Sequence, residues 1–149
     1  MLSGFGPDGR LMPSLSPNRS PLPALGLLLV GSIGMAAVWV LLARFVGGGQ
    51  MSWFAVLVAI DASLMLRLGR MRPGLPRAAW AVLGTFLAIA LANWGIVAAQ
   101  MGAPMGLLPW ESLTRLGPGF TWVLTMLVND RVDFAWWGAA LVVAAVASR

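Results

Sequence analysis

Four long runs of this chain are apolar and almost free of charge. The first, residues 24–45, reads ALGLLLVGSIGMAAVWVLLARF, and its only charged residue is Arg44. A helix of about 20 residues, rising about 1.5 Å per residue, crosses a hydrocarbon core of about 30 Å. Similar runs follow at residues 51–68, 78–101 and 132–148. The pattern predicts an all-α integral membrane protein, a four-helix bundle made of two transmembrane hairpins.

The composition supports the same class and removes most catalytic chemistry. The chain is 59% hydrophobic and 10% charged, whereas a soluble domain is about 45–50% apolar and about 25% charged. It has no Cys, His, Tyr or Lys, so it has no thiol nucleophile, thiolate metal site or imidazole proton shuttle. We therefore expect a non-catalytic protein without a cofactor or a metal ion.

Two segments outside these runs have a different character. Residues 1–23 are rich in Pro, Gly and Ser and predict a disordered cytoplasmic tail, followed by a transmembrane domain over residues 24–149. Within the connection between the last two spans, Phe120–Val128 is apolar but too short to cross a bilayer as a helix. We expect residues 105–128 to form an interfacial segment, whose apolar part lies in the membrane interface, packs on the bundle or dips partway into the membrane.

The basic residues predict the orientation of the chain. All ten are Arg and the net charge is +5, but they stand between apolar runs, which favours lipid phosphates over nucleic acid as their partner. Four spans place seven arginines on the side of both termini and three on the other side. The positive-inside rule then puts both termini in the cytoplasm, in a bacterial inner membrane. The seven are Arg10, Arg19, Arg67, Arg70, Arg72, Arg77 and Arg149; the three are Arg44, Arg115 and Arg131.

One arginine cluster stands out in this count. Arg67, Arg70, Arg72 and Arg77 lie within eleven residues, and Pro73 and Pro76 interrupt any continuous helix there. The plainer interpretation is that the cluster sets topology and anchors the cytoplasmic leaflet. The more specific one is a contact with an anionic lipid or with an acidic cytoplasmic partner.

Asp61 is the most informative single residue, because it lies near the middle of the second span. A charged carboxylate at that depth costs roughly 2.5–3.5 kcal/mol on insertion scales, so it must point inward, be protonated or have a partner. Asn93 of the third span has a similar predicted depth and is the first candidate partner. Arg44 lies too near the outer surface, and Arg67 lies on the wrong face of the same helix.

Three interpretations of Asp61 stay open. It forms an interhelical hydrogen bond with Asn93, with Ser32 or with a backbone carbonyl; it docks a cationic residue of another membrane subunit; or it is a proton or cation site in transport.

Small residues and helix caps complete the sequence pattern. Every span carries small residues four apart, which favours close helix packing within the chain or against another subunit. Asp130 is a predicted N-cap of the last span, with Asp133 in its first turn and Trp136 and Trp137 as interfacial anchors. The small-residue sets are Ser32 and Ala36; Ala55, Ala59 and Ser63; Gly84, Ala88 and Ala92; and Ala140, Ala144 and Ser148.

The first hairpin and the last span resemble small, uncharacterised four-span membrane proteins of bacteria. The resemblance rests on Gly31, Gly34 and Trp39, the turn at residues 47–49, Trp53, the sequence Arg67-Leu68-Gly69, and Asp133-Phe134-Ala135-Trp136. Asp61 departs from the small or apolar residue that this resemblance implies at its position. What the resemblance implies is the architecture and the inner membrane, and no activity.

The expected function is an accessory, regulatory or partner-binding membrane subunit, which associates with the lipid bilayer and with another membrane protein or a second copy. The alternative is a small oligomeric transporter or channel that uses Asp61. A membrane enzyme is a third and weaker reading.

Overall fold

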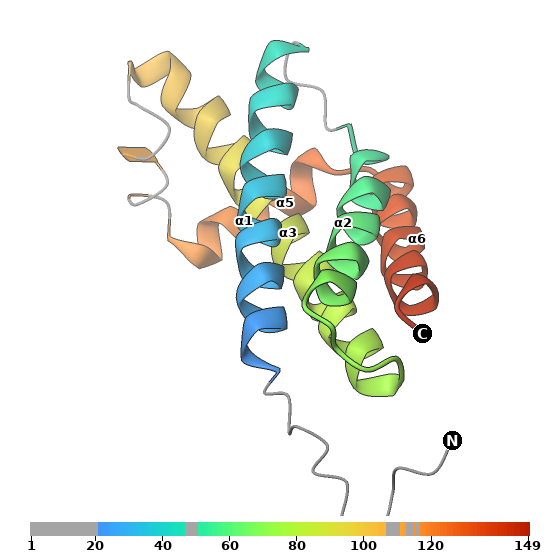
Figure 1. Cartoon of the computed structure of the whole chain (residues 1–149). Coiled ribbons are helices and arrows are strands. Elements are labelled where there is room, and N and C mark those ends of the chain that lie inside the picture. The colour runs from blue at the N-terminus through green and yellow to red at the C-terminus, as the bar shows by residue number, and fades with distance from the viewer. Residues whose placement is uncertain (1–20, 47–50, 107–110, 113–114, 116) are drawn as a thin grey trace, which may run out of the picture.

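The computed structural model describes residues 21–46, 51–106, 111–112, 115 and 117–149. It gives complete bounds for five α-helices, and the described residues form no β-strand. The helices, shown in Figure 1, are α1 (Leu22–Phe45), α2 (Phe54–Leu68), α3 (Leu75–Gly102), α5 (Pro118–Val128) and α6 (Arg131–Ala147), with a short 3-10 helix, η1 (Ala103–Met105), after α3. The all-α prediction is confirmed for these residues.

Helices α1, α2, α3 and α6 lie where the sequence predicts the four spans, and their ends differ from the predicted ends by three residues or fewer. The predicted disordered tail, residues 1–23, lies mostly outside the described residues. Its last part is helical, since α1 begins at Leu22 with Pro23 in its first turn. Proline is tolerated there because the first N–H groups of a helix have no partner within the helix.

The four long helices alternate in direction. At one end, the last turn of α2 meets the first turn of α1, where a Cβ on Gly69 would come within 2.4 Å of the Ala24 Cα atom. The C-terminus of α6 lies at the same end, because Arg67 and Arg77 donate hydrogen bonds to its last carbonyls. This end also holds the described start of the chain (Figure 1).

The other end of the bundle is joined by contacts between α1, α2 and α6. The Trp39 ring of α1 packs on Phe54 of α2, with ring centroids 5.6 Å apart. Ser52, just before α2, donates a hydrogen bond of 2.5 Å to the Asp133 carboxylate of α6. An alternating bundle of this kind brings consecutive helices together as antiparallel neighbours.

Helices α1 and α3 pack most closely at two glycines of α3. A Cβ on Gly84 would lie 2.5 Å from Leu28 Cδ1, and one on Gly95 would lie 2.5 Å from Val40 Cγ2. Ser32 donates a hydrogen bond of 3.1 Å to the Gly84 carbonyl across the same interface. Such close approach of backbones is possible only where side chains are absent or very small.

The predicted caps of the last span are present. The Asp130 N–H donates a hydrogen bond of 2.8 Å to Asp133 Oδ2, so the first turn of α6 is closed by its own carboxylate. Helix α5, with 11 residues, is too short to cross a bilayer and packs against α3. Part of the predicted interfacial segment, residues 107–110, 113–114 and 116, lies outside the described residues.

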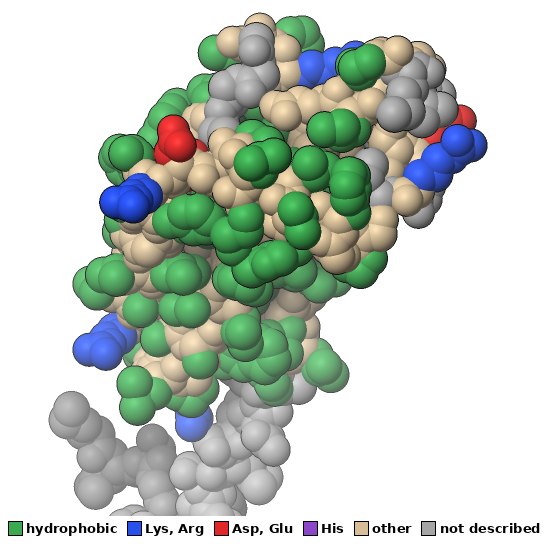
Figure 2. Space-filling view, turned by 180° about the vertical axis from the view of Figure 1, so that it is seen from behind, with side chains coloured by type: hydrophobic (Ala, Val, Ile, Leu, Met, Phe, Trp, Pro, Cys, Tyr) green, Lys and Arg blue, Asp and Glu red, His purple; other side chains and the backbone are tan. Residues whose placement is uncertain are grey.

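Among the described residues, α1 and α3 are the helices long and apolar enough to cross a membrane. Helices α2 and α6 have only 15 and 17 residues, so the four-span arrangement stays a prediction. Only 22% of the most apolar stretch of α1 is buried inside the bundle, so most of this stretch faces outward. Large apolar side chains of all five α-helices are exposed, and Figure 2 shows hydrophobic side chains across the face that it presents.

Candidate functional site

Asp61 lies at the centre of α2, with seven residues of the helix on each side. Its carboxylate reaches the seam between α1 and α2, where a Cβ on Gly31 would lie 2.9 Å from Asp61 Oδ2. The side chain is half-buried. On the same helix it stands between the buried Val58 and the exposed Leu64, so it occupies the margin of the bundle and not its core.

The structure does not bring Asp61 and Asn93 together as partners. Asn93 Nδ2 donates to the Ile89 carbonyl of its own helix, and Asn93 Oδ1 accepts a hydrogen bond of 3.2 Å from Asn129. Ser32, the other predicted partner, donates to the Gly84 carbonyl. Neither side chain is therefore bonded to Asp61. Asn93 is bonded within α3 and to Asn129, and Ser32 is bonded to the backbone of α3.

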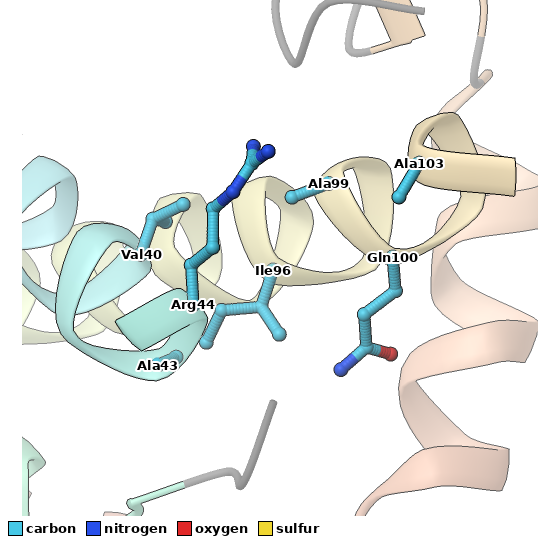
Figure 3. Close-up of a pocket in the computed structure, with 7 residues that line it drawn as sticks. All are labelled: Val40, Ala43, Arg44, Ile96, Ala99, Gln100 and Ala103. Carbon is cyan, nitrogen blue, oxygen red and sulfur yellow. The ribbon is translucent and has the colours of Figure 1, made fainter. Parts of the chain in front are cut away.

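The arginines are also too far from Asp61 to pair with it. Arg44 is 13 residues beyond Gly31 on α1, about 20 Å along the helix axis. It borders a hollow of about 160 Å³ between the ends of α1 and α3, where Figure 3 shows Arg44 and Gln100 pointing to opposite sides. The Arg67 guanidinium donates to the Ala147 carbonyl. Within the described residues, Asp61 therefore has no hydrogen-bond or ion-pair partner.

The arginine cluster divides into two parts in the structure. Arg77 is buried, and its guanidinium donates hydrogen bonds of 2.6 Å to the Ser148 carbonyl and 3.1 Å to the Arg149 carbonyl. The last carbonyls of a helix have no partner within the helix, and Arg77 satisfies them at the end of α6. Arg77 thus has a structural role, which Arg67 shares in part, and contact of either residue with lipid stays a prediction.

Arg70 and Arg72 are exposed in the loop between α2 and α3. They remain the members of the cluster that are placed to meet a lipid phosphate or an acidic partner, and that contact stays a prediction.

A buried polar cluster between α3 and α5 was not predicted. Asn129 donates to both Asn93 Oδ1 and the Thr125 carbonyl, and Thr125 and Thr121 are buried one and two turns earlier. The signal was present in the sequence: residues 121, 125 and 129 are polar and four apart, so they share a face of an apolar helix.

Ionisable groups elsewhere do not form a second site. No group of three or more His, Cys, Asp or Glu side chains that could hold a metal ion occurs in the described part of the chain. Asp130 and Asp133 are engaged in capping α6, and Asp133 also accepts from Ser52. Asp61 is thus the carboxylate whose position in the fold calls for a functional explanation.

Comparisons with protein-family models, with curated proteins and with solved structures find no match for this chain.

Proposed function

We propose that this chain is a four-span inner-membrane protein, with both termini in the cytoplasm, that binds another membrane protein through Asp61. The alternating helices, the exposed apolar side chains and the arginines at the end of the bundle that carries the C-terminus support this membrane arrangement. It acts as a non-catalytic accessory or regulatory subunit.

The observation that carries the proposal is the unpartnered carboxylate at the middle of α2. A charged group in that position is costly and is retained where it faces a partner, a cavity or the bundle interior. Asp61 faces the seam beside Gly31, and the adjacent Gly34 position is open, with no atom within 4 Å of a Cβ placed there. The seam therefore has room for a side chain supplied from outside.

The partner that fits this seam is a membrane helix with an Arg or Lys near its middle. Such a residue would be as costly in lipid as Asp61, and pairing removes both costs at once. The exposed Leu64 of α2, three residues after Asp61, lies near the same face of that helix and would contact the apolar part of the partner helix.

Asp61→Asn tests the docking role. It keeps the size of the side chain but removes the charge. Removing one charge of a buried ion pair costs about 2 kcal/mol or more of binding free energy, which weakens the affinity about thirtyfold. A photoreactive amino acid at Leu64 would report binding as a crosslink, and we expect the crosslink to be lost in Asp61→Asn.

Asp130→Asn is the matched control, because it makes the same chemical change at an exposed cap where Asn serves as well as Asp. A membrane protein that is crosslinked supports the proposal only if a charge swap restores binding. In that swap, Asp61→Lys is combined with replacement of the partner's basic residue by an acidic one. Crosslinking that is equal in Asp61→Asn and the native chain would contradict docking at this site.

The alternative, a small oligomeric transporter or channel, uses the same carboxylate in another way. It requires several copies, because one bundle of this size has few polar groups to line a path. The particle mass in detergent and the proton flux in liposomes separate the two: a homo-oligomer whose flux disappears in Asp61→Asn favours transport.

A second measurement tests the orientation. Alkaline phosphatase, which is active only outside the cytoplasm, should be inactive when fused after Arg149 and active when inserted in the turn at residues 47–49. The positive-inside rule gives this direction, since Arg67, Arg70, Arg72 and Arg77 lie at the end that carries the C-terminus. High activity after Arg149 would exclude the four-span model.

A further inference from the structure

The seam between α1 and α2 has two unequal sides around Asp61. A Cβ placed on Gly31 would lie 2.9 Å from Asp61 Oδ2 and 2.9 Å from Met65 Cγ, so the Met65 side chain fills the seam next to the carboxylate. Three residues further along α1, a Cβ placed on Gly34 would meet no atom within 4 Å. Residues three apart share a face of a helix. The space beside Asp61 is therefore open toward Gly34 and closed toward Met65.

These two directions lead to opposite ends of the bundle. Because α1 and α2 are antiparallel, Gly34 lies toward the end where α1 leads into α2, whereas Met65 lies toward the end that carries the C-terminus. In the four-span arrangement proposed above, the open side is the outer one. The stem of a Lys or Arg is long enough to reach over one helical turn, about 5.4 Å. A basic side chain held one turn nearer the outer surface would thus reach Asp61 over Gly34.

The rest of the seam offers an apolar track to a helix. Residues three or four apart share a helix face, so those in register with Gly31 on α1 and with Asp61 on α2 border the same seam. Steps of three and four residues are the spacing on which a second helix packs at a shallow crossing angle. The large apolar residues in this register are at least 40% exposed: Leu27, Val38 and Leu41 on α1, and Leu57, Leu64 and Leu68 on α2.

A membrane helix fits this seam better than lipid does. Acyl chains would cover the apolar track but offer nothing to the carboxylate of Asp61, which is costly to leave unpaired at that depth. A helix satisfies its own backbone groups within the hydrocarbon, and it can present one polar side chain from an apolar surface. It therefore covers the track and pairs with Asp61 at the same time.

A second copy of this chain is not placed to supply the basic residue. All ten basic residues are Arg, since the chain has neither Lys nor His, and each arginine of the described helices lies within three residues of a helix end. At the inner end, Arg67 and Arg77 are bonded to the last carbonyls of α6. At the outer end, Arg44 and Arg131 are too far from the middle of α2. The partner is therefore a different protein.

We propose that the seam between α1 and α2 receives a membrane helix of a different protein, whose Lys or Arg side chain passes over Gly34 and meets Asp61 from the outer side. This inference rests on the docking role proposed for Asp61, and it adds the side of approach and the exclusion of a second copy. Gly34 admits the side chain of the partner, although no contact within the described fold requires a glycine there.

The probe is a designed single-span protein, a leucine helix with one arginine near its middle, made together with the full chain in a bacterial membrane. A photoreactive amino acid at Leu64 should crosslink to this probe and not to a version with leucine in place of the arginine. Gly34→Leu should lower the yield about tenfold or more, because the added side chain fills the open side of the seam. Gly26→Leu, another open position near the start of α1, is the matched control.

The outcomes separate the side of approach from the docking role itself. If Asp61→Asn loses the crosslink but Gly34→Leu keeps it, approach over Gly34 is wrong and docking at Asp61 stands. A crosslink between two differently tagged copies of the chain, lost in Asp61→Asn, would overturn the assignment to a different protein. Equal yields with both probes, or in Asp61→Asn and the native chain, would overturn both proposals. Gly34→Leu should not lower the thermal midpoint, so its lost crosslink would not reflect a lost fold.

Discussion

Gly84→Leu should destabilise the bundle by about 3 kcal/mol or more. A Cβ at this position would already lie 2.5 Å from Leu28 Cδ1, and Leu28 is itself buried between α1 and α3. Overpacking a close helix contact forces the helices apart and costs about 1–3 kcal/mol, occasionally more. The substitution would also break the hydrogen bond from Ser32 to the Gly84 carbonyl. The measurement is thermal unfolding of the purified protein in a mild detergent.

Gly34→Leu is the control for this prediction. It makes the same change in α1 at a position where a Cβ would meet no atom within 4 Å. The added side chain would face outward, where it replaces a residue of poor helix propensity. If Gly84→Leu unfolds at the same temperature as Gly34→Leu, then α1 and α3 do not pack as described.

Arg77→Met should give the second large effect, a loss of about 2–3 kcal/mol. Methionine keeps the apolar stem, but the guanidinium bonds to the carbonyls of Ser148 and Arg149 and to that of Met71 are lost. Hydrogen bonds from a charged donor contribute about 1.5–3 kcal/mol each, and water at the end of the bundle can replace part of this. We expect the C-terminal turn of α6 to detach first, with faster amide exchange there.

Arg72→Met removes the same charge from an exposed position in the loop just before α3. Its effect on the thermal midpoint should be small, because isolated exposed charges contribute little to stability. Equal destabilisation by the two substitutions would show that net charge at this end matters, and not the bonds that Arg77 makes.

The helices and their packing faces could be predicted from the sequence to a large extent. Apolar run lengths gave the positions of α1, α2, α3 and α6, because a helix that faces lipid or a packed core needs an uninterrupted apolar stretch. Spacing by four predicted which faces are packed: the small-residue sets of these four helices are all buried in the structure. Asp130 and Asp133 were predictable as caps because capping is local to one turn.

The aromatic residues show where this reasoning is less complete. Trp136 and Trp137 were both assigned to the membrane interface. In the structure Trp136 is 42% exposed, whereas Trp137 is half-buried against Phe134, with ring centroids 4.8 Å apart. Adjacent residues on a helix point about 100° apart, so the two rings meet different surroundings, and their place at a membrane interface stays a prediction. Trp39 of α1, by contrast, is a core residue that is 1% exposed.

By itself, the sequence determined the all-α fold class, the positions of the helices, their packing faces and the one carboxylate that lies within an apolar helix. These depend on composition and on periods of about four residues. Only the tertiary structure decided which groups meet: Asn93 bonds with Asn129, Arg77 holds the end of α6, and Asp61 lies unpaired beside Gly31. Pairings of this kind depend on the rotation and tilt of helices far apart in the sequence, which periodicity leaves open.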